Sequence, residues 1–267
     1  MNDIEKYALV TGGTSGIGYE LVKLLAKDGY NLVIVARDEA ELRSVSDAIK
    51  RQYDVKVLTL AKDLFEVENA FAVYDEVSQE GIEPEILIND AGQGHYGEFT
   101  DTDLRKELQI IQLNISSLVV LTKLFLKDMV ERGEGKILNL SSIASKTPGP
   151  WQSVYHGTKA FVQSFTQAVR SEVKETGVTI TALLPGATDT DFFNKADMND
   201  AKVVKEGKLD DAEKVAKDGY DALMSGEDMV VSGIKNKLQV AMGAITSDET
   251  LADKTKKKQA PVKEKHQ

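Results

Sequence analysis

Four polar side chains have the types and spacing of a proton-transfer site. Tyr155 and Lys159 are four residues apart, so on a helix both side chains lie on one face. A free tyrosine titrates near about pH 10, and a neighbouring ammonium favours the phenolate and lowers that pKa. Ser142 ends an expected strand, where its hydroxyl can donate a hydrogen bond to a reacting oxygen. The chemistry that fits is proton exchange with a carbonyl or alcohol oxygen, with Tyr155 as the acid and base.

Asn114 is the fourth member of this set, because it is a polar residue inside a long apolar segment, residues 108–130. A buried amide must find hydrogen-bond partners, and these can be catalytic or purely structural. Ser142 has a second interpretation as a polar cap at the end of a strand, and any helix can carry a tyrosine and a lysine four residues apart. The complete set of Asn114, Ser142, Tyr155 and Lys159 favours catalysis.

A glycine-rich turn, residues 11–18, reads TGGTSGIG between the first expected strand and the first expected helix. Glycines let a backbone turn tightly and approach a pyrophosphate, and a helix N-terminus offers free N–H groups to it. An ordinary turn between a strand and a helix can also carry glycines. The setting between strand and helix therefore favours nucleotide binding, although the spacing differs from GxGxxG.

These residues are positioned by apolar runs that alternate with helical stretches. The runs are rich in Val, Ile and Leu and cover residues 8–10, 31–36, 55–60, 86–88, 136–140 and 178–184, with a short strand at 229–231. Such runs are typical of strands buried on both faces of a parallel sheet. The sequence therefore predicts an α/β fold, a single Rossmann-type doubly wound parallel sheet with helices on both faces.

The turn and four later stretches together resemble the short-chain dehydrogenase/reductase superfamily over residues 5–190. The stretches are Asp63-Leu64, Asn89-Asp90-Ala91-Gly92, Ser141 to Ala144 with Tyr155 to Lys159, and Pro185-Gly186 with Thr190. Asp90 departs from the commoner Asn of the family. The resemblance implies a nicotinamide cofactor, with Lys159 on its ribose and Asn114 linked to Lys159 through a water. The cofactor-binding residues that it implies are Gly12, Thr14, Ser15, Gly16, Ile17, Gly18, Arg37, Asp63, Leu64, Asn89, Ala91, Gly92, Tyr155, Lys159, Pro185, Gly186, Thr188 and Thr190.

The end of the second strand predicts NADP rather than NAD. A carboxylate there selects NAD, and a basic group pairs with the 2′-phosphate of NADP. Ala36 stands where NAD-using relatives carry Asp, and Arg37 follows it. Arginine's planar fork suits a phosphate, although Asp38 adds a negative charge nearby and Arg37 can also serve only to solvate the loop.

Bulk composition excludes several function classes. The 267 residues carry a net charge of −10, which argues against a nucleic-acid binder. The absence of cysteine excludes thiolate catalysis, and three scattered histidines give no metal-site spacing. We expect no signal peptide, no integral membrane segment and a cytoplasmic location, since charged residues interrupt segment 108–130 and the N-terminus lacks the features of a signal peptide.

The C-terminal third is expected to shape the substrate site. Within a catalytic domain of residues 1–252, residues 187–208 are predicted to form a mobile lid, and the pocket lining is predicted to include His95, Tyr96, Pro148, Pro150, Trp151, Phe192 and Phe193. Ile234 to Ile245 has the spacing of an amphipathic helix that packs on its own domain, caps a dimer or lies on a membrane. Residues 253–267 are rich in lysine and predicted to be disordered.

The sequence thus predicts an oxidoreductase that moves a hydride between NADP and a small, partly apolar carbonyl or alcohol substrate, as a homodimer or tetramer. A 3-oxoacyl thioester reductase is an alternative, but an acidic carrier protein would need a basic docking patch that this acidic chain does not clearly supply. A cofactor-binding sensor without turnover is another alternative. It has no chemical need for both Tyr155 and Lys159.

Overall fold

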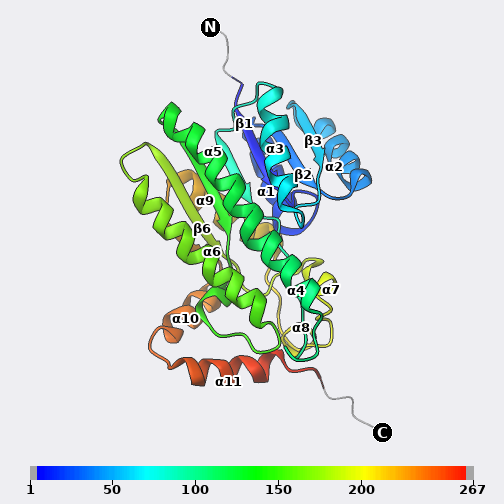
Figure 1. Cartoon of the computed structure of the whole chain (residues 1–267), viewed down its shortest axis with the longest axis vertical. Helices are drawn as coiled ribbons and strands as arrows, with labels where there is room; N and C mark the ends of the chain where they lie inside the picture. Colours follow the sequence, from blue (N-terminus) through cyan, green and yellow to red (C-terminus); the bar gives the residue numbers. More distant parts are fainter. Residues whose placement is uncertain (1–4, 263–267) are drawn as a thin grey trace.

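The expected strands form one parallel sheet. The computed structural model describes residues 5–262, and in it seven strands take the order β3-β2-β1-β4-β5-β6-β7 (Figure 1). The strands are β1 (Tyr7–Thr11), β2 (Asn31–Ala36), β3 (Val57–Ala61), β4 (Ile86–Asn89), β5 (Gly135–Leu140), β6 (Val178–Leu184) and β7 (Met229–Val231). The central residues of β1, β2, β4, β5 and β6 are buried, as expected of strands covered on both faces, whereas the edge strands β3 and β7 are only partly buried. The predicted fold class is confirmed.

Two layers of helices cover the sheet. On one face, α1 (Gly16–Lys27), α2 (Glu39–Gln52) and α9 (Ala212–Ser225) bury aliphatic side chains such as Leu21 and Leu223. On the other face lie α3 (Val67–Gln79), α5 (Leu118–Arg132) and α6 (Ser153–Glu172), which stands in front of the sheet in Figure 1. The chain order reverses beside β1, and ligands of doubly wound folds bind in the crevice at such a point.

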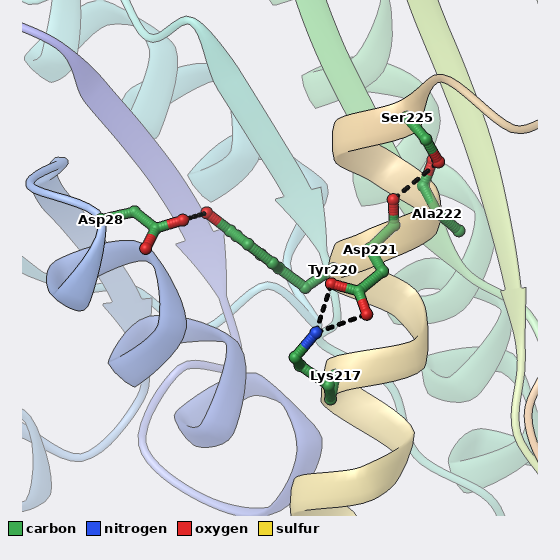
Figure 2. Close-up of polar contacts among 6 residues, drawn as sticks. All are labelled: Asp28, Lys217, Tyr220, Asp221, Ala222 and Ser225. Carbon is green, nitrogen blue, oxygen red and sulfur yellow. Dashed lines mark hydrogen bonds and ion pairs between the residues drawn. The ribbon is translucent and has the colours of Figure 1, made fainter.

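A hydrogen bond joins two helices of the first layer. Figure 2 shows the hydroxyl of Tyr220, on α9, donating to the carboxylate of Asp28 at the end of α1. Burial and this bond raise the pKa of the Tyr220 hydroxyl. Lys217 and Asp221 form an exposed ion pair on α9. Exposed pairs of this kind stabilise little, so the registration of α9 on α1 rests on Tyr220 and the apolar contacts.

The apolar segment around Asn114 is one continuous helix, Leu104–Arg132, made of α4 (Leu104–Ile111), a π-helical segment η1 (Gln112–Ser117) and α5. By length and composition it can cross a membrane, and 44% of its most apolar window is buried inside the structure. It contacts α3, α6 and strands β4 and β5. These are the contacts of a helix packed on a sheet.

The chain after β6 gathers at the carboxyl ends of the strands. Residues 187–208 contain the short helices α7 (Phe192–Lys195) and α8 (Lys202–Lys205), with a small core of Phe193, Ala196, Met198 and Ala201. Whether this segment moves as a lid stays a prediction. A short 3-10 helix η2 (Ile143–Lys146) follows β5, and α10 (Ile234–Gly243) follows β7. Ile234, Leu238, Met242 and Ile245 are exposed. Helix α10 contacts its own domain through η2 and through Val240, which packs beside Leu184 and Val231.

The prediction of a disordered tail is wrong for residues 253–259, and residues 263–267 lie outside the described part. Helix α11 (Asp248–Gln259) crosses the lower end of the molecule beneath α6 and α10 (Figure 1). Ser247 caps it by accepting from the Thr250 N–H, and acidic residues stand in its first turn with lysines in its last turn. These local signals, together with the burial of Gln259, favour a helix in spite of the polar composition.

Candidate active site

A single cleft of about 1280 Å³ runs along the carboxyl ends of the strands. The glycine turn lines one end of it, Ser142 and Tyr155 line its middle, and residues of α8, α10 and α11 line the other end. Sites for one small molecule usually occupy about 300–1,000 Å³. The cleft therefore has room for a cofactor and a substrate side by side.

The glycine turn fits an anionic group. Gly12 and Gly16 have φ angles of 73° and 56°, and a Cβ on Gly16 would lie 2.9 Å from Cγ2 of Thr190. Ser15, the N-cap of α1, makes no side-chain cap, and the first turn of α1 carries no acidic residue. The helix end at Gly16 and Ile17 therefore remains open to a pyrophosphate.

Most of the residues implied by the family resemblance line the cleft, and three do not. Gly18 lies below the turn, where a Cβ would come within 2.4 Å of the Gly12 carbonyl oxygen, so its role is packing. Asn89 is buried and donates to Thr122 at 3.0 Å and Asn139 at 2.9 Å, which braces β4 against β5. Lys159 is buried just behind the cleft wall. The predicted residues that do line it are Gly12, Thr14, Ser15, Gly16, Ile17, Arg37, Asp63, Leu64, Ala91, Gly92, Tyr155, Pro185, Gly186, Thr188 and Thr190.

Arg37 is exposed at the cleft, with its guanidinium 5.1 Å from the ring centroid of Phe65. Among the described residues Arg37 forms no ion pair with Asp38, whose carboxylate caps α2 by accepting from the Ala40 and Glu41 N–H groups at 2.8 and 2.9 Å. Asp63 also lines the cleft and accepts from the Phe65 N–H at 3.1 Å, so it stabilises its own turn. The charge of Arg37 therefore stays available to a ligand.

Tyr155 and Ser142 meet in the middle of the cleft. Burial raises the pKa of the Tyr155 hydroxyl to about 12, and the Ser142 hydroxyl beside it acts in the opposite direction. Ser142 also accepts from the Ala144 N–H at 3.1 Å and caps η2, so the structural interpretation is confirmed, and the catalytic role stays a prediction. At neutral pH Tyr155 is a protonated phenol that can donate to a reacting oxygen.

Lys159 and Asn114 lie behind Tyr155. The Lys159 ammonium is 5.8 Å from the Tyr155 ring centroid and donates to the Leu140 carbonyl at 2.7 Å. Burial lowers its pKa to about 8. The Asn114 amide accepts from the Gln93 backbone N–H at 3.0 Å and donates to the Gln93 carbonyl at 2.9 Å. It also donates to the Thr158 hydroxyl at 3.0 Å. These bonds fix the amide, and Asn114 stands within η1, a type of distortion frequent at functional sites.

Asp90 is a charged group whose part in the site was not predicted. Its Oδ1 atom is buried without a partner among the described residues, and its Oδ2 atom lies against the glycine turn. Burial raises the pKa of the Asp90 carboxyl to about 7, while the Lys159 charge and the Gly18 N–H lower it. The departure from the family's Asn was the sequence signal for this position.

His156 and Gln259 form a second connection that the sequence did not reveal. Nδ1 of His156 bonds the Thr147 carbonyl at 2.8 Å, and Nε2 lies 3.1 Å from the Gln259 amide nitrogen. Gln259 also approaches Gln152 at 3.3 Å, and its carbonyl accepts from the Tyr96 hydroxyl at 2.5 Å. Helix α11 is thereby fastened to the start of α6, the helix of Tyr155.

The predicted pocket lining is partly wrong. Phe192 and Phe193 line the cleft, with the Phe192 ring centroid 5.1 Å from that of Tyr155. Tyr96 and Trp151 instead stack on each other at 5.6 Å and lie outside the lining, because Tyr96 turns to hold Gln259. His95, Pro148 and Pro150 also lie outside it, and residues of α10 and α11 take part instead.

Comparison with known proteins agrees with this geometry. The family model described as short chain dehydrogenase matches residues 6–201. Very-long-chain 3-oxoacyl-CoA reductases of Rattus norvegicus and Homo sapiens are 36% and 38% identical over 67% of this chain, and this chain spans 58% of their length.

Solved structures agree as well. A short-chain dehydrogenase from Sphingobium yanoikuyae in complex with NADPH matches with a TM-score of 0.81 and 27% identity, covering 90% of this chain and 93% of that one. The bulky-bulky ketone specific alcohol dehydrogenase from Comamonas testosteroni, at 24% identity and a TM-score of 0.76 over 90% and 93% of the two chains, shares the fold. With its parallel sheet, glycine turn and Tyr155–Lys159 pair, the chain belongs to the short-chain dehydrogenase family.

Proposed function

We propose that this protein is an NADP-dependent oxidoreductase that transfers a hydride between the nicotinamide and a carbonyl or alcohol group of a partly apolar substrate. The proposal rests on one observation above all. Ser142 and Tyr155 line the same cleft as the glycine turn, with Lys159 directly behind Tyr155. A sensor without turnover would not require this arrangement.

The residues of the chain handle the proton. A bound nicotinamide supplies the hydride for reduction and accepts it for oxidation. Tyr155, protonated at neutral pH because burial raises its pKa to about 12, donates to the substrate oxygen as negative charge develops there. The Ser142 hydroxyl donates to the same oxygen, and the Lys159 charge favours the phenolate that remains. Asn114 fixes the backbone at Gln93 beside them.

Arg37 supports NADP as the cofactor. Its guanidinium is exposed at the end of β2 and is not engaged by Asp38, which caps α2. A planar guanidinium can bond a phosphate through two N–H groups. The Sphingobium yanoikuyae relative, which is similar at 27% identity, holds NADPH, and this adds to the case.

The test is NADPH oxidation by the purified protein with a panel of aldehydes, ketones and oxoacyl thioesters, beside Tyr155→Phe. We expect turnover that falls at least about 100-fold in the variant, since general acid catalysis contributes about 10²–10⁴. NADPH binding must stay within a few-fold in the variant, which shows that the cleft is intact. NADPH binding without turnover of any substrate, in either direction, would instead favour a sensor.

A 3-oxoacyl thioester reductase is the second candidate, and a specific finding favours it. The curated relatives named very-long-chain 3-oxoacyl-CoA reductase are 36–38% identical to this chain in rat and human. Because the chain spans 58% of their length, the shared activity is a proposal. It predicts that a 3-oxoacyl thioester has a higher kcat/KM than a simple ketone of the same chain length.

Location and assembly are further proposals. We infer a cytoplasmic homo-oligomer in which α4 and α6 pair with a second copy, because Leu104, Leu108 and Phe161 expose apolar side chains on these helices. Light scattering on the purified protein tests the oligomer, and fractionation of cells tests the location. A monomer, or recovery with the membranes, would contradict the respective proposal.

A further inference from the structure

We propose that the α8–α11 end of the cleft binds the anionic carrier portion of an amphiphilic substrate, a phosphate-bearing group joined to an apolar acyl chain. The inference rests on the proposed reductase function and names its substrate class. Six lysines from three segments line this end of the cleft, and we call them the lysine rim: Lys202, Lys208, Lys235, Lys254, Lys257 and Lys258.

The lysine rim is a local reversal of charge. The chain as a whole has 43 acidic and 33 basic residues, yet none of the six rim lysines forms an ion pair within residues 5–262. Of the acidic residues that share this end of the cleft, Asp191 pairs with Lys195 and Asp210 accepts from Asn236 at 2.7 Å. Glu206 is the remaining carboxylate there. Positive charges gathered around a cleft attract an anionic ligand and raise its local concentration.

Apolar side chains adjoin the rim inside the same cleft. Leu238 and Met242 on α10 line it and are 61% and 56% exposed, and Leu251 on α11 lies in the same wall. On the side of the reacting group, Phe192 contacts the Tyr155 ring. Large exposed apolar groups at the entrance of a cleft mark a binding surface. The entrance therefore suits a molecule with an apolar chain and a charged head.

The rim is held in place by its own helix contacts. Gln259, next to Lys258, bonds His156 and Gln152 at the start of α6. The Ala260 carbonyl accepts from the Lys202 N–H at 3.1 Å, which ties α11 to α8. The lysines of α11 therefore face the cleft from a fastened helix. Six positive groups exceed what one carboxylate needs, so a carrier with several phosphate charges fits better than a free oxo acid.

The experiment compares three substrates that share one acyl chain. They are 3-oxododecanoyl-CoA, the uncharged N-acetylcysteamine thioester of the same acid, and the free 3-oxo acid. The test variant is Lys254→Gln/Lys257→Gln/Lys258→Gln. The matched control is Lys27→Gln/Lys50→Gln/Lys174→Gln, which removes equal charge from exposed sites away from the cleft.

We expect the test variant to raise KM for the CoA thioester at least tenfold, while kcat and the KM for the uncharged thioester change less than twofold. The control should match the wild type with all three substrates. Raising the salt concentration should raise the KM of the wild type toward that of the test variant for the CoA thioester, and for neither of the other two substrates.

Three results would overturn the inference. The first is equal KM values of wild type and test variant for the CoA thioester. The second is a loss confined to the free acid, which would assign the rim to a carboxylate. The third is unchanged kinetics with lost binding to vesicles of anionic lipid, which would make the entrance a membrane surface. If no substrate turns over, the reductase proposal fails by itself, and calorimetry with dodecanoyl-CoA then tests the rim directly, with equal affinity in both variants refuting it.

Discussion

Asp90 offers a test of how the buried charges behind the glycine turn act on stability. Burial raises the pKa of its carboxyl from 3.8 to about 7. Between these values the folded protein binds a proton that the unfolded chain has released, so the stability of the wild type falls as the pH rises toward 7. Asp90→Asn keeps an acceptor for the Gly18 N–H and removes the titration. The variant should therefore gain stability relative to the wild type with rising pH.

The magnitude follows from the pKa. The comparison is made at pH 5.5, which lies above the isoelectric point of about 5.0, and at pH 8. About 1.5 pH units of this interval lie below the folded pKa of about 7, where the folded protein keeps its proton and the unfolded chain does not. At about 1.36 kcal/mol per unit this gives about 2 kcal/mol. A domain of this size shifts its Tm by about 2–4 °C per kcal/mol, so the difference between the two Tm values should widen by about 4–8 °C.

The assay is thermal unfolding of both proteins at the two pH values and constant ionic strength. Exposed Asp101→Asn serves as the matched control for the loss of one carboxylate away from the glycine turn. If the Tm difference between Asp90→Asn and the wild type is the same at both pH values, Asp90 is not held with a raised pKa. The conclusion that burial raises the Asp90 pKa more than the Lys159 charge lowers it would then be wrong.

Three further predictions concern the cleft. Arg37→Ala should raise KM for NADPH about tenfold or more, since charged hydrogen bonds contribute about 1.5–3 kcal/mol, and leave KM for NADH unchanged; equal losses with both cofactors would contradict its role. Ser142→Ala should lower kcat about 100-fold with little change in KM. A change in KM alone would refute the catalytic role of Ser142 and leave it only the structural role of capping η2. Gln259→Ala should destabilise by about 1–3 kcal/mol and expose α11 to proteases, because the His156 and Gln152 contacts are lost; proteolysis at the wild-type rate would refute the fastening.

Local patterns were enough for the fold and for placing Ser142 and Tyr155 in one cleft, and the catalytic roles of these residues stay predictions. Strand runs of Val, Ile and Leu, the glycine turn and the Tyr155–Lys159 spacing depend on neighbours in the chain, and the sheet order and the cleft agree with them. The same reasoning placed Gly18 and Asn89 at the cofactor, and in the structure neither lines the cleft: Gly18 packs against Gly12, and Asn89 bonds Thr122. A sequence motif indicates that a residue type is required at a position. Only the tertiary surroundings of that residue show which contact requires it.

The lysines of α11 show what the tertiary structure alone decides. Considered by itself, the segment from Asp253 has the composition of a solvated tail, because few of its side chains can be buried. In the fold, Gln259 meets His156 across 103 residues of sequence, and this contact brings Lys254, Lys257 and Lys258 to the cleft. Composition and periodicity carry no information about such a contact. The contact between Gln259 and His156 depends on the folded path of the chain from the end of β6 through α10. It also depends on which buried hydrogen-bond donors would otherwise lack an acceptor.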